Sequence, residues 1–171
     1  MRLSQTLTSL LVATAFAASA GAHEYFVGGP VHKYDMEIAA NYLLGVEMAP
    51  MPAGMSMDKN AIHLEADVHA TADNAWGFPD GFWIPMLTIN YTLVKEGTDW
   101  KATGKLVPMQ AKDGPHYANN VAMNGPGKYK VTYQFVSPTE SGYIRHTDKE
   151  TGLPEWWKTF DETFEFSYPQ K

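Results

Sequence analysis

The sequence predicts an all-β protein, with the immunoglobulin-like antiparallel β-sandwich as its fold class. In several segments apolar residues alternate with polar ones, and turns rich in glycine and proline separate these segments. No stretch of the sequence has a helical repeat of useful length. Many short strands joined by such turns are typical of two packed antiparallel sheets.

We expect about seven strands and a single domain. The strands are predicted over residues 36–44, 62–70, 83–94, 99–109, 116–123, 127–136 and 161–168. The clearest is GKYKVTYQFV at 127–136, where every second residue from Tyr129 onward is apolar and those between are polar. Two long segments, 48–60 and 137–158, are expected to be loops, and long loops on a rigid scaffold often carry function.

Residues 1–22 have the layout of a secretory signal peptide. Arg2 precedes an apolar run from Leu7 to Ala18 that is too short for a stable membrane span, and small residues follow it. Cleavage after Ala20 and cleavage after Ala22 both fit the small-x-small pattern. We therefore expect residues 23–171 to form one domain in the periplasm, with secretion from a Gram-positive cell as the alternative.

The cleavage position decides whether the mature N-terminus carries a metal-binding motif. Cleavage after Ala20 would expose Gly21-Ala22-His23, whose amine, backbone nitrogens and imidazole suit square-planar Cu(II). Cleavage after Ala22 would remove this motif.

Composition excludes several classes of function. The chain has no cysteine, so it has neither disulfides nor the thiolate ligand of blue-copper proteins. Its net charge of −6 is spread along the chain without a basic cluster, which makes nucleic acid an unsuitable partner. Hydrolytic catalysis has no support either, because neither a nucleophile elbow nor a phosphate-binding loop is present.

The stretch HLEADVHA, residues 63–70, places ionisable groups at every second position: His63, Glu65, Asp67 and His69. The residues between them are apolar, so one face of this strand should be buried. His63 and Glu65 would lie about 6.6–6.8 Å apart along the strand, close enough to lean toward one ion, whereas His69 lies roughly 20 Å from His63. The alternative is a strand whose polar face is simply solvated.

A second candidate pair occurs in MQAKDGPHY, where Met109 and His116 flank a turn signal. A turn there would bring a thioether and an imidazole together, and this pair of ligands suits copper. The alternative for Met109 is packing in the core. His146, in the polar segment RHTDKETG, would by itself be assigned to the surface.

Four methionines, Met48, Met51, Met55 and Met57, lie in the first long loop. They are expected to form an adaptable hydrophobic flap, with a funnel for soft metal ions as the alternative.

Several motifs in order along the chain resemble the periplasmic iron-transport accessory proteins found beside ferrous-iron permeases. The resemblance covers nearly all of the chain after residue 22. It rests on MEIAANYL, GM at 54–55, HLEADVHA, WIPMLTINYTL, VPMQAKDGPHYANNV, GKYKVTYQF, RHTDKETG and WWKTFDETFEF.

This resemblance implies a homodimeric immunoglobulin-like sandwich that holds copper near the subunit interface, with iron or manganese as further metals. Its ligands map to His63, Glu65, Met109, His116 and His146, with Glu24 as an acidic residue near the mature N-terminus. Members often have a further histidine where this chain has Ile144, so any secondary metal position that depends on it is not expected here.

The resulting functional hypothesis is a periplasmic copper- and iron-binding accessory protein of a high-affinity iron uptake system that works with an inner-membrane permease. It would be a transport protein rather than a turnover enzyme. The first alternative is a copper-dependent redox enzyme that acts on iron or superoxide. The second is a metal-free interaction domain in which the histidines are incidental.

Overall fold

The computed structural model describes residues 23–170, which form eight strands and no helix. The strands are β1 (Tyr25–Lys33), β2 (Met36–Leu44), β3 (Ala61–Ala70), β4 (Thr88–Lys95), β5 (Lys101–Gln110), β6 (Pro115–Ala122), β7 (Gly127–Val136) and β8 (Phe160–Tyr168). All neighbouring strands are antiparallel.

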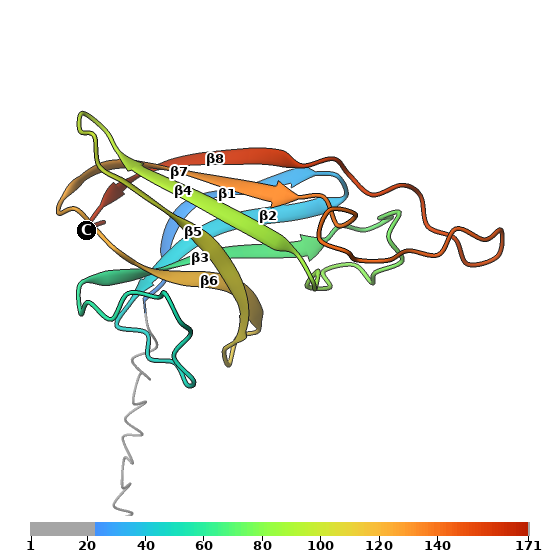
Figure 1. Ribbon diagram of the computed structural model, residues 1–171, viewed down its shortest axis with the longest axis horizontal. Helices are drawn as coiled ribbons and strands as arrows, with labels where there is room; N and C mark the ends of the chain where they lie inside the picture. Colours follow the sequence, from blue (N-terminus) through green and yellow to red (C-terminus); the bar gives the residue numbers. More distant parts are fainter. Residues whose placement is uncertain (1–22, 171) are drawn as a thin grey trace, which may run out of the picture.

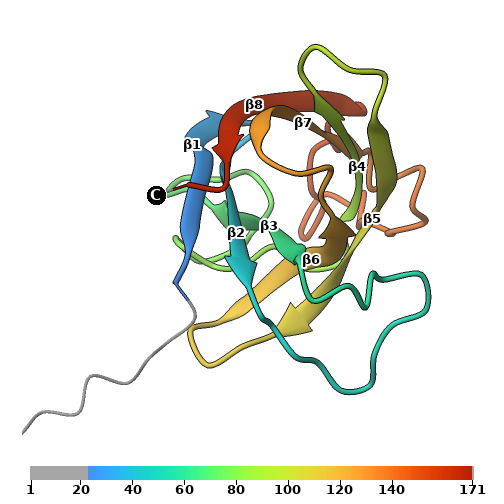
Figure 2. The ribbon, with the colours of Figure 1, turned by 90° about the vertical axis from the view of Figure 1, so that its left-hand side faces the viewer.

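The strands form one sheet in the order β1-β2-β3-β6-β5-β4-β7-β8, which curls into a nearly closed barrel (Figures 1 and 2). The all-β prediction is confirmed. The immunoglobulin-like sandwich is not, because β5 pairs with both β6 and β4 and so joins the two halves of the sheet. None of residues 23–170 belongs to a helix with the length and apolar character needed to cross a membrane.

The barrel interior is the hydrophobic core. Alternate residues of most strands point into it, and the largest fully buried side chains include five aromatics: Tyr42, Tyr117, Tyr129, Tyr133 and Phe135. Burial of this apolar surface is the main stabilising contribution to the fold. Each buried tyrosine hydroxyl also needs a hydrogen-bond partner, and that of Tyr133 donates to the backbone oxygen of Glu65 at 2.7 Å.

The first strand was missed in the sequence analysis. Its centre reads Gly28-Gly29-Pro30, which interrupts the alternating pattern, and the structure has two irregularities in the β1–β2 register at this point. An edge strand tolerates proline and bulges because one side of it has no ladder to maintain. The other predicted strands are confirmed with small shifts of their ends, except that the strand predicted over 83–94 starts five residues later.

The barrel is closed between β1 and β8 by side chains. Gly28 faces the ring of Phe164 so closely that a Cβ atom at this position would collide with it. The ammonium group of Lys33 donates to the backbone oxygen of Asp161 at 3.2 Å, and Gln170 Nε2 donates to the backbone oxygen of Phe26 at 2.6 Å. We call this contact the β1–β8 seam.

The strand predicted from Trp83 begins at Thr88 instead. Met86 has a φ of 63°, in the left-handed region, which interrupts the extended backbone. Trp83 makes an isolated bridge with His69. The loops 71–87 and 137–159 extend from one end of the barrel, whereas loop 45–60 lies beneath its other end (Figure 1).

Candidate metal centre

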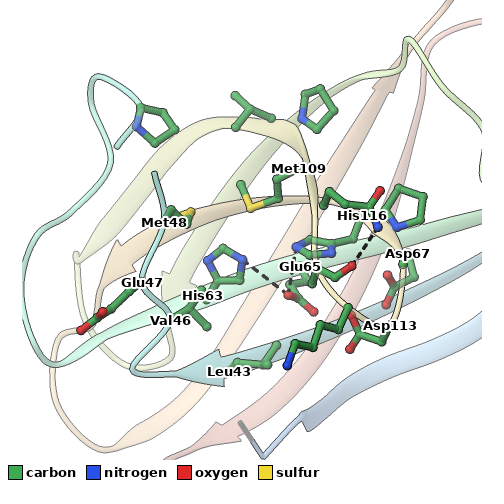
Figure 3. Close-up of a pocket in the computed structure, with 18 of the residues that line it drawn as sticks. Leu43, Val46, Glu47, Met48, His63, Glu65, Asp67, Met109, Asp113 and His116 are labelled. Carbon is green, nitrogen blue, oxygen red and sulfur yellow. Dashed lines mark hydrogen bonds and ion pairs between the residues drawn. The ribbon is translucent and has the colours of Figure 1, made fainter. Parts of the chain in front are cut away.

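The outer face of β3 carries a polar cluster that is closed to solvent. His63 is 2% exposed and Glu65 is 7% exposed, although both point away from the barrel interior. They line a cavity of about 1110 Å³ bounded by loop 45–60 and by the hairpin that joins β5 to β6 (Figure 3). The solvated-strand alternative is therefore wrong for these two residues.

His63, Glu65 and His116 converge on one point. Glu65 Oε1 lies 3.5 Å from His63 Nε2 and 3.4 Å from His116 Nε2, and the ligand atoms of the three side chains lie within 4.8 Å of one another. Donor atoms bound to one first-row ion at roughly 2.0–2.3 Å stand roughly 3–3.5 Å apart. This spacing fits a shared metal ion.

The strand pairing produces this convergence. Glu65 on β3 is opposite Ala118 on β6, and His116 lies two residues before Ala118 on the same face. Met109 on β5 is in turn opposite His116. Residues more than forty positions apart in the chain are thus brought together by the ladders β3–β6 and β5–β6.

The nitrogens that face Glu65 are suited to metal binding. His63 Nδ1 lies 2.6 Å from Asn120 Oδ1, and because that oxygen only accepts, we assign the proton to Nδ1 and the lone pair to Nε2. His116 Nε2 is buried and has no partner in hydrogen-bond geometry. A buried nitrogen without a partner is costly, and a metal ion would satisfy it.

The charges of the cluster are also those of a cation site. Burial, followed by the negative charges of Asp67, Glu24 and Asp113, raises the pKa of Glu65 to about 8. Burial is the main cause that lowers the pKa of His63. On its own the cluster therefore disfavours both a carboxylate and an imidazolium, and a bound cation would reverse the penalty on the carboxylate.

A second group of oxygens adjoins the first. Glu24, Glu65 and Asp67 offer ligand atoms within 4.8 Å of one another, and Asp67 also accepts a hydrogen bond from Asn41 Nδ2 at 3.0 Å. Burial is the largest cause that raises the pKa of Glu24 and of Asp67. Such carboxylates suit hard cations. Glu24 thus lines the same cavity as Glu65, and its role as a ligand stays a prediction.

Two methionines add soft ligands to the cavity. Met109 lines the cavity as expected, and Met48 lines it from loop 45–60. Their sulfur atoms point toward each other beside the ring of His63 (Figure 3). Of the four loop methionines only Met48 lines this cavity, while Met57 is 84% exposed and Met55 is buried at 8% exposure.

His146 does not lie in the cavity of its own chain. It is in the loop 137–159, at the far end of the barrel (Figure 1), and its side chain is 74% exposed. Its Nδ1 lies 2.7 Å from Thr151 Oγ1, which leaves Nε2 as the nitrogen for an ion. Ile144, in the same loop, is 87% exposed.

Two residues were not named as part of the site from the sequence: Asp67, which lines the cavity, and Asn120, which bonds to His63. Asp67 belongs to the alternating polar residues of HLEADVHA, so the sequence pattern could have indicated it. No sequence pattern indicates Asn120, because its role depends on cross-strand pairing with His63. The predicted signal peptide, residues 1–22, lies outside the described residues, as do Gly21 and Ala22 of the predicted N-terminal motif.

The chain is similar to solved and curated proteins over most of its length. A copper-bound variant of FetP from uropathogenic Escherichia coli strain F11 has 49% sequence identity and a TM-score of 0.81, with 86% of this chain and 98% of that chain covered. The copper-reconstituted protein P19 of Campylobacter jejuni has 42% identity and a TM-score of 0.80, with coverages of 86% and 97%. A UPF0423 protein of Brucella abortus (strain 2308) is 42% identical over 158 residues, which is 90% of this chain and 86% of that protein.

The model of one protein family matches nearly the whole described chain. The match extends over residues 21–169, and the family is described as Fe2+ transport protein. The sequence resemblance pointed to the same group of proteins. The chain therefore belongs to the Iron_transport family of Fe2+ transport proteins.

Proposed function

We propose that this protein is a periplasmic metal-binding accessory protein of a high-affinity iron uptake system. The observation that carries the proposal is the convergence of His63, Glu65 and His116 on one buried point. Membership of the Fe2+ transport family supplies the transport context, and the copper-bound relatives supply the first metal to test. The partner is an inner-membrane iron permease.

The ligand set suits copper with iron as a second metal. The imidazoles accept either oxidation state of copper, and the thioether of Met109 favours Cu(I). Glu65 and Asp67 add hard oxygens, which are the ligands that iron and manganese prefer. One cavity thus combines a soft side and a hard side, as a protein that handles both metals requires.

A homodimer would complete the site. His146 is exposed on a loop that extends away from the cavity of its own chain, so it can reach a metal ion only in another copy. Because His146 Nδ1 is hydrogen-bonded to Thr151, the Nε2 atom of His146 would be the one that binds a copper ion of the second subunit. The metal would then lie at the subunit interface.

Copper affinity tests the site. His116→Ala removes a buried ligand and should weaken copper binding by more than about 100-fold, since losing even a residue that only hydrogen-bonds to a ligand costs about 10–100-fold. Calorimetry of the metal-free protein with copper measures the effect. Glu165→Gln, on the outer side of β8 in an ion pair with Lys130, is the matched surface control. Unchanged affinity in His116→Ala would remove this residue from the site.

The dimer is tested separately. His146→Ala should weaken copper binding while leaving the mass of the apoprotein in light scattering unchanged, because an exposed imidazole contributes little to stability. If the protein is a monomer with copper bound, His146 has no route to the centre and the interface proposal fails.

A copper-dependent redox enzyme is the alternative, and the cavity has room for more than one small ligand. The two functions differ in stoichiometry. A transport protein oxidises or reduces at most about one equivalent of iron per bound copper, whereas an enzyme continues over many turnovers. Stopped-flow iron oxidation by the copper-loaded protein, with oxygen as the oxidant, distinguishes them.

A further inference from the structure

A second set of ligand-type side chains lies at the other end of β3. His32 on β1 is opposite Glu37 on β2, and Glu37 is opposite His69 on β3. All three point outward, because the residues that alternate with them along β2 and β3, such as Met36 and Val68, are 0% exposed in the core. The three side chains therefore form a row across three adjacent strands.

The row borders a surface hollow. A cavity of about 190 Å³ is lined by His32, Glu37 and His69 together with Asp80 from loop 71–87. The loop is fixed beside the row by two backbone hydrogen bonds with Ala70: Gly81 N donates to its oxygen at 2.8 Å, and its nitrogen donates to the oxygen of Phe82 at 2.8 Å. Two imidazoles and two carboxylates thus share one depression.

One edge of the row is already in contact. His32 Nε2 lies 3.1 Å from Glu37 Oε2, and both side chains are about half exposed. An exposed pair of this kind contributes little to stability. The backbones of neighbouring strands stand roughly 4.7–4.9 Å apart, so side chains of all three strands can turn toward an ion above Glu37. Binding of the ion would require the side chains to rotate but would not require the backbone to move.

From this geometry we propose that His32, Glu37 and His69 form a second, surface site for a divalent first-row ion such as Zn²⁺, with Asp80 as a further oxygen ligand. Two neutral imidazoles with carboxylate oxygens are a ligand set that zinc accepts. Glu65 and His69 are four residues apart on β3, or roughly 13 Å, so an ion held by His32, Glu37 and His69 would be separate from one held by Glu65, although His69 also lines the larger cavity. The proposal does not depend on the proposed function.

Zinc stoichiometry and NMR test this site. Equilibrium dialysis of the chelator-treated protein against Zn²⁺ at pH 7.5 should give one bound equivalent fewer in the double variant His32→Ala, His69→Ala than in the wild type. Glu37→Gln should weaken that equivalent by roughly 10-fold. Glu165→Gln, another exposed glutamate in a cross-strand ion pair, is the matched control and should keep the wild-type stoichiometry.

Site-specific signals make the result decisive. The ring resonances of His32 and His69 should shift together on addition of Zn²⁺, whether or not the buried centre holds copper. Equal zinc stoichiometry in the wild type and the double variant would overturn the proposal. So would ring resonances that do not respond at millimolar Zn²⁺.

Discussion

The two faces of β3 are both largely closed to solvent, yet burial of their side chains changes the stability of the protein in opposite directions. On the inner face Leu64 and Val68 are 0% exposed, and their burial contributes roughly 1.5–3 kcal/mol each to stability. On the outer face His63 and Glu65 are 2% and 7% exposed, and burying such groups without full pairing costs stability. Burial therefore marks a core on one face and a binding site on the other.

The largest expected effect is on the inner face. Leu64→Ala should lower the free energy of unfolding by about 2–5 kcal/mol, because it leaves a cavity in the core. Copper affinity, measured under conditions where the variant is folded, should stay near the wild-type value. Urea unfolding and calorimetry give the two quantities. A large loss of copper affinity would mean that the two faces are not independent.

The outer face should respond with the opposite sign. Glu65→Gln should stabilise the metal-free protein by about 1–3 kcal/mol above pH 8, because the wild-type carboxyl is ionised there while buried, at a cost to the folded state that an uncharged glutamine does not carry. Because Glu65 borders a large cavity, we expect solvent to screen its charge and the effect to be smaller than the full pKa shift implies.

The pH dependence follows from the sign of the shift. The pKa of Glu65 is raised from 4.5 to about 8 in the folded protein, so the folded state binds more protons than the unfolded state between these values. Wild-type stability should thus fall relative to Glu65→Gln as the pH rises from about 4.5 to 8. The lowered pKa of His63 acts in both proteins and largely cancels in their difference. Parallel curves for the two proteins would contradict this prediction.

The smallest expected effect comes from the residue that orients His63. Asn120→Ala removes the acceptor of Nδ1–H and should weaken copper binding by about 10-fold, since partners of metal ligands fix their tautomer. Asn119→Ala is the matched control on β6, because Asn119 donates to the backbone oxygen of Lys105 instead. Equal copper affinities in the two variants, measured by competition with a chelator, would remove the orienting role of Asn120.

The sequence predicted most strands because the period of two is a local property of each segment. It failed at β1, where Gly28-Gly29-Pro30 breaks the period, and at the start of β4, where Met86 turns the chain. The closure into a barrel could not be predicted from the local sequence pattern, since it depends on β5 pairing with both β4 and β6.

The sequence predicted which residues could bind a metal ion, but it did not predict how they are arranged in space. The polar period in HLEADVHA indicated His63 and Glu65, and the turn signal at Gly114-Pro115 indicated His116 as a separate candidate, while only the family resemblance grouped the three. Their convergence depends on the register between β3 and β6. The contribution of Met48 depends on the path of a long loop, and that of His146 as a ligand remains a prediction.

The β1–β8 seam has a consequence for motion. Because side-chain contacts rather than a backbone ladder close the seam, local opening of the barrel should begin there. Backbone amide hydrogens of the edge strands should then exchange with solvent before those of the central strands. β3 and β6 are neighbours in the middle of the strand order and are paired on both sides. The edge strands β1 and β8 can thus separate while β3 and β6 stay paired and keep the metal ligands in place. A bound metal ion should therefore be retained through the first local unfolding event.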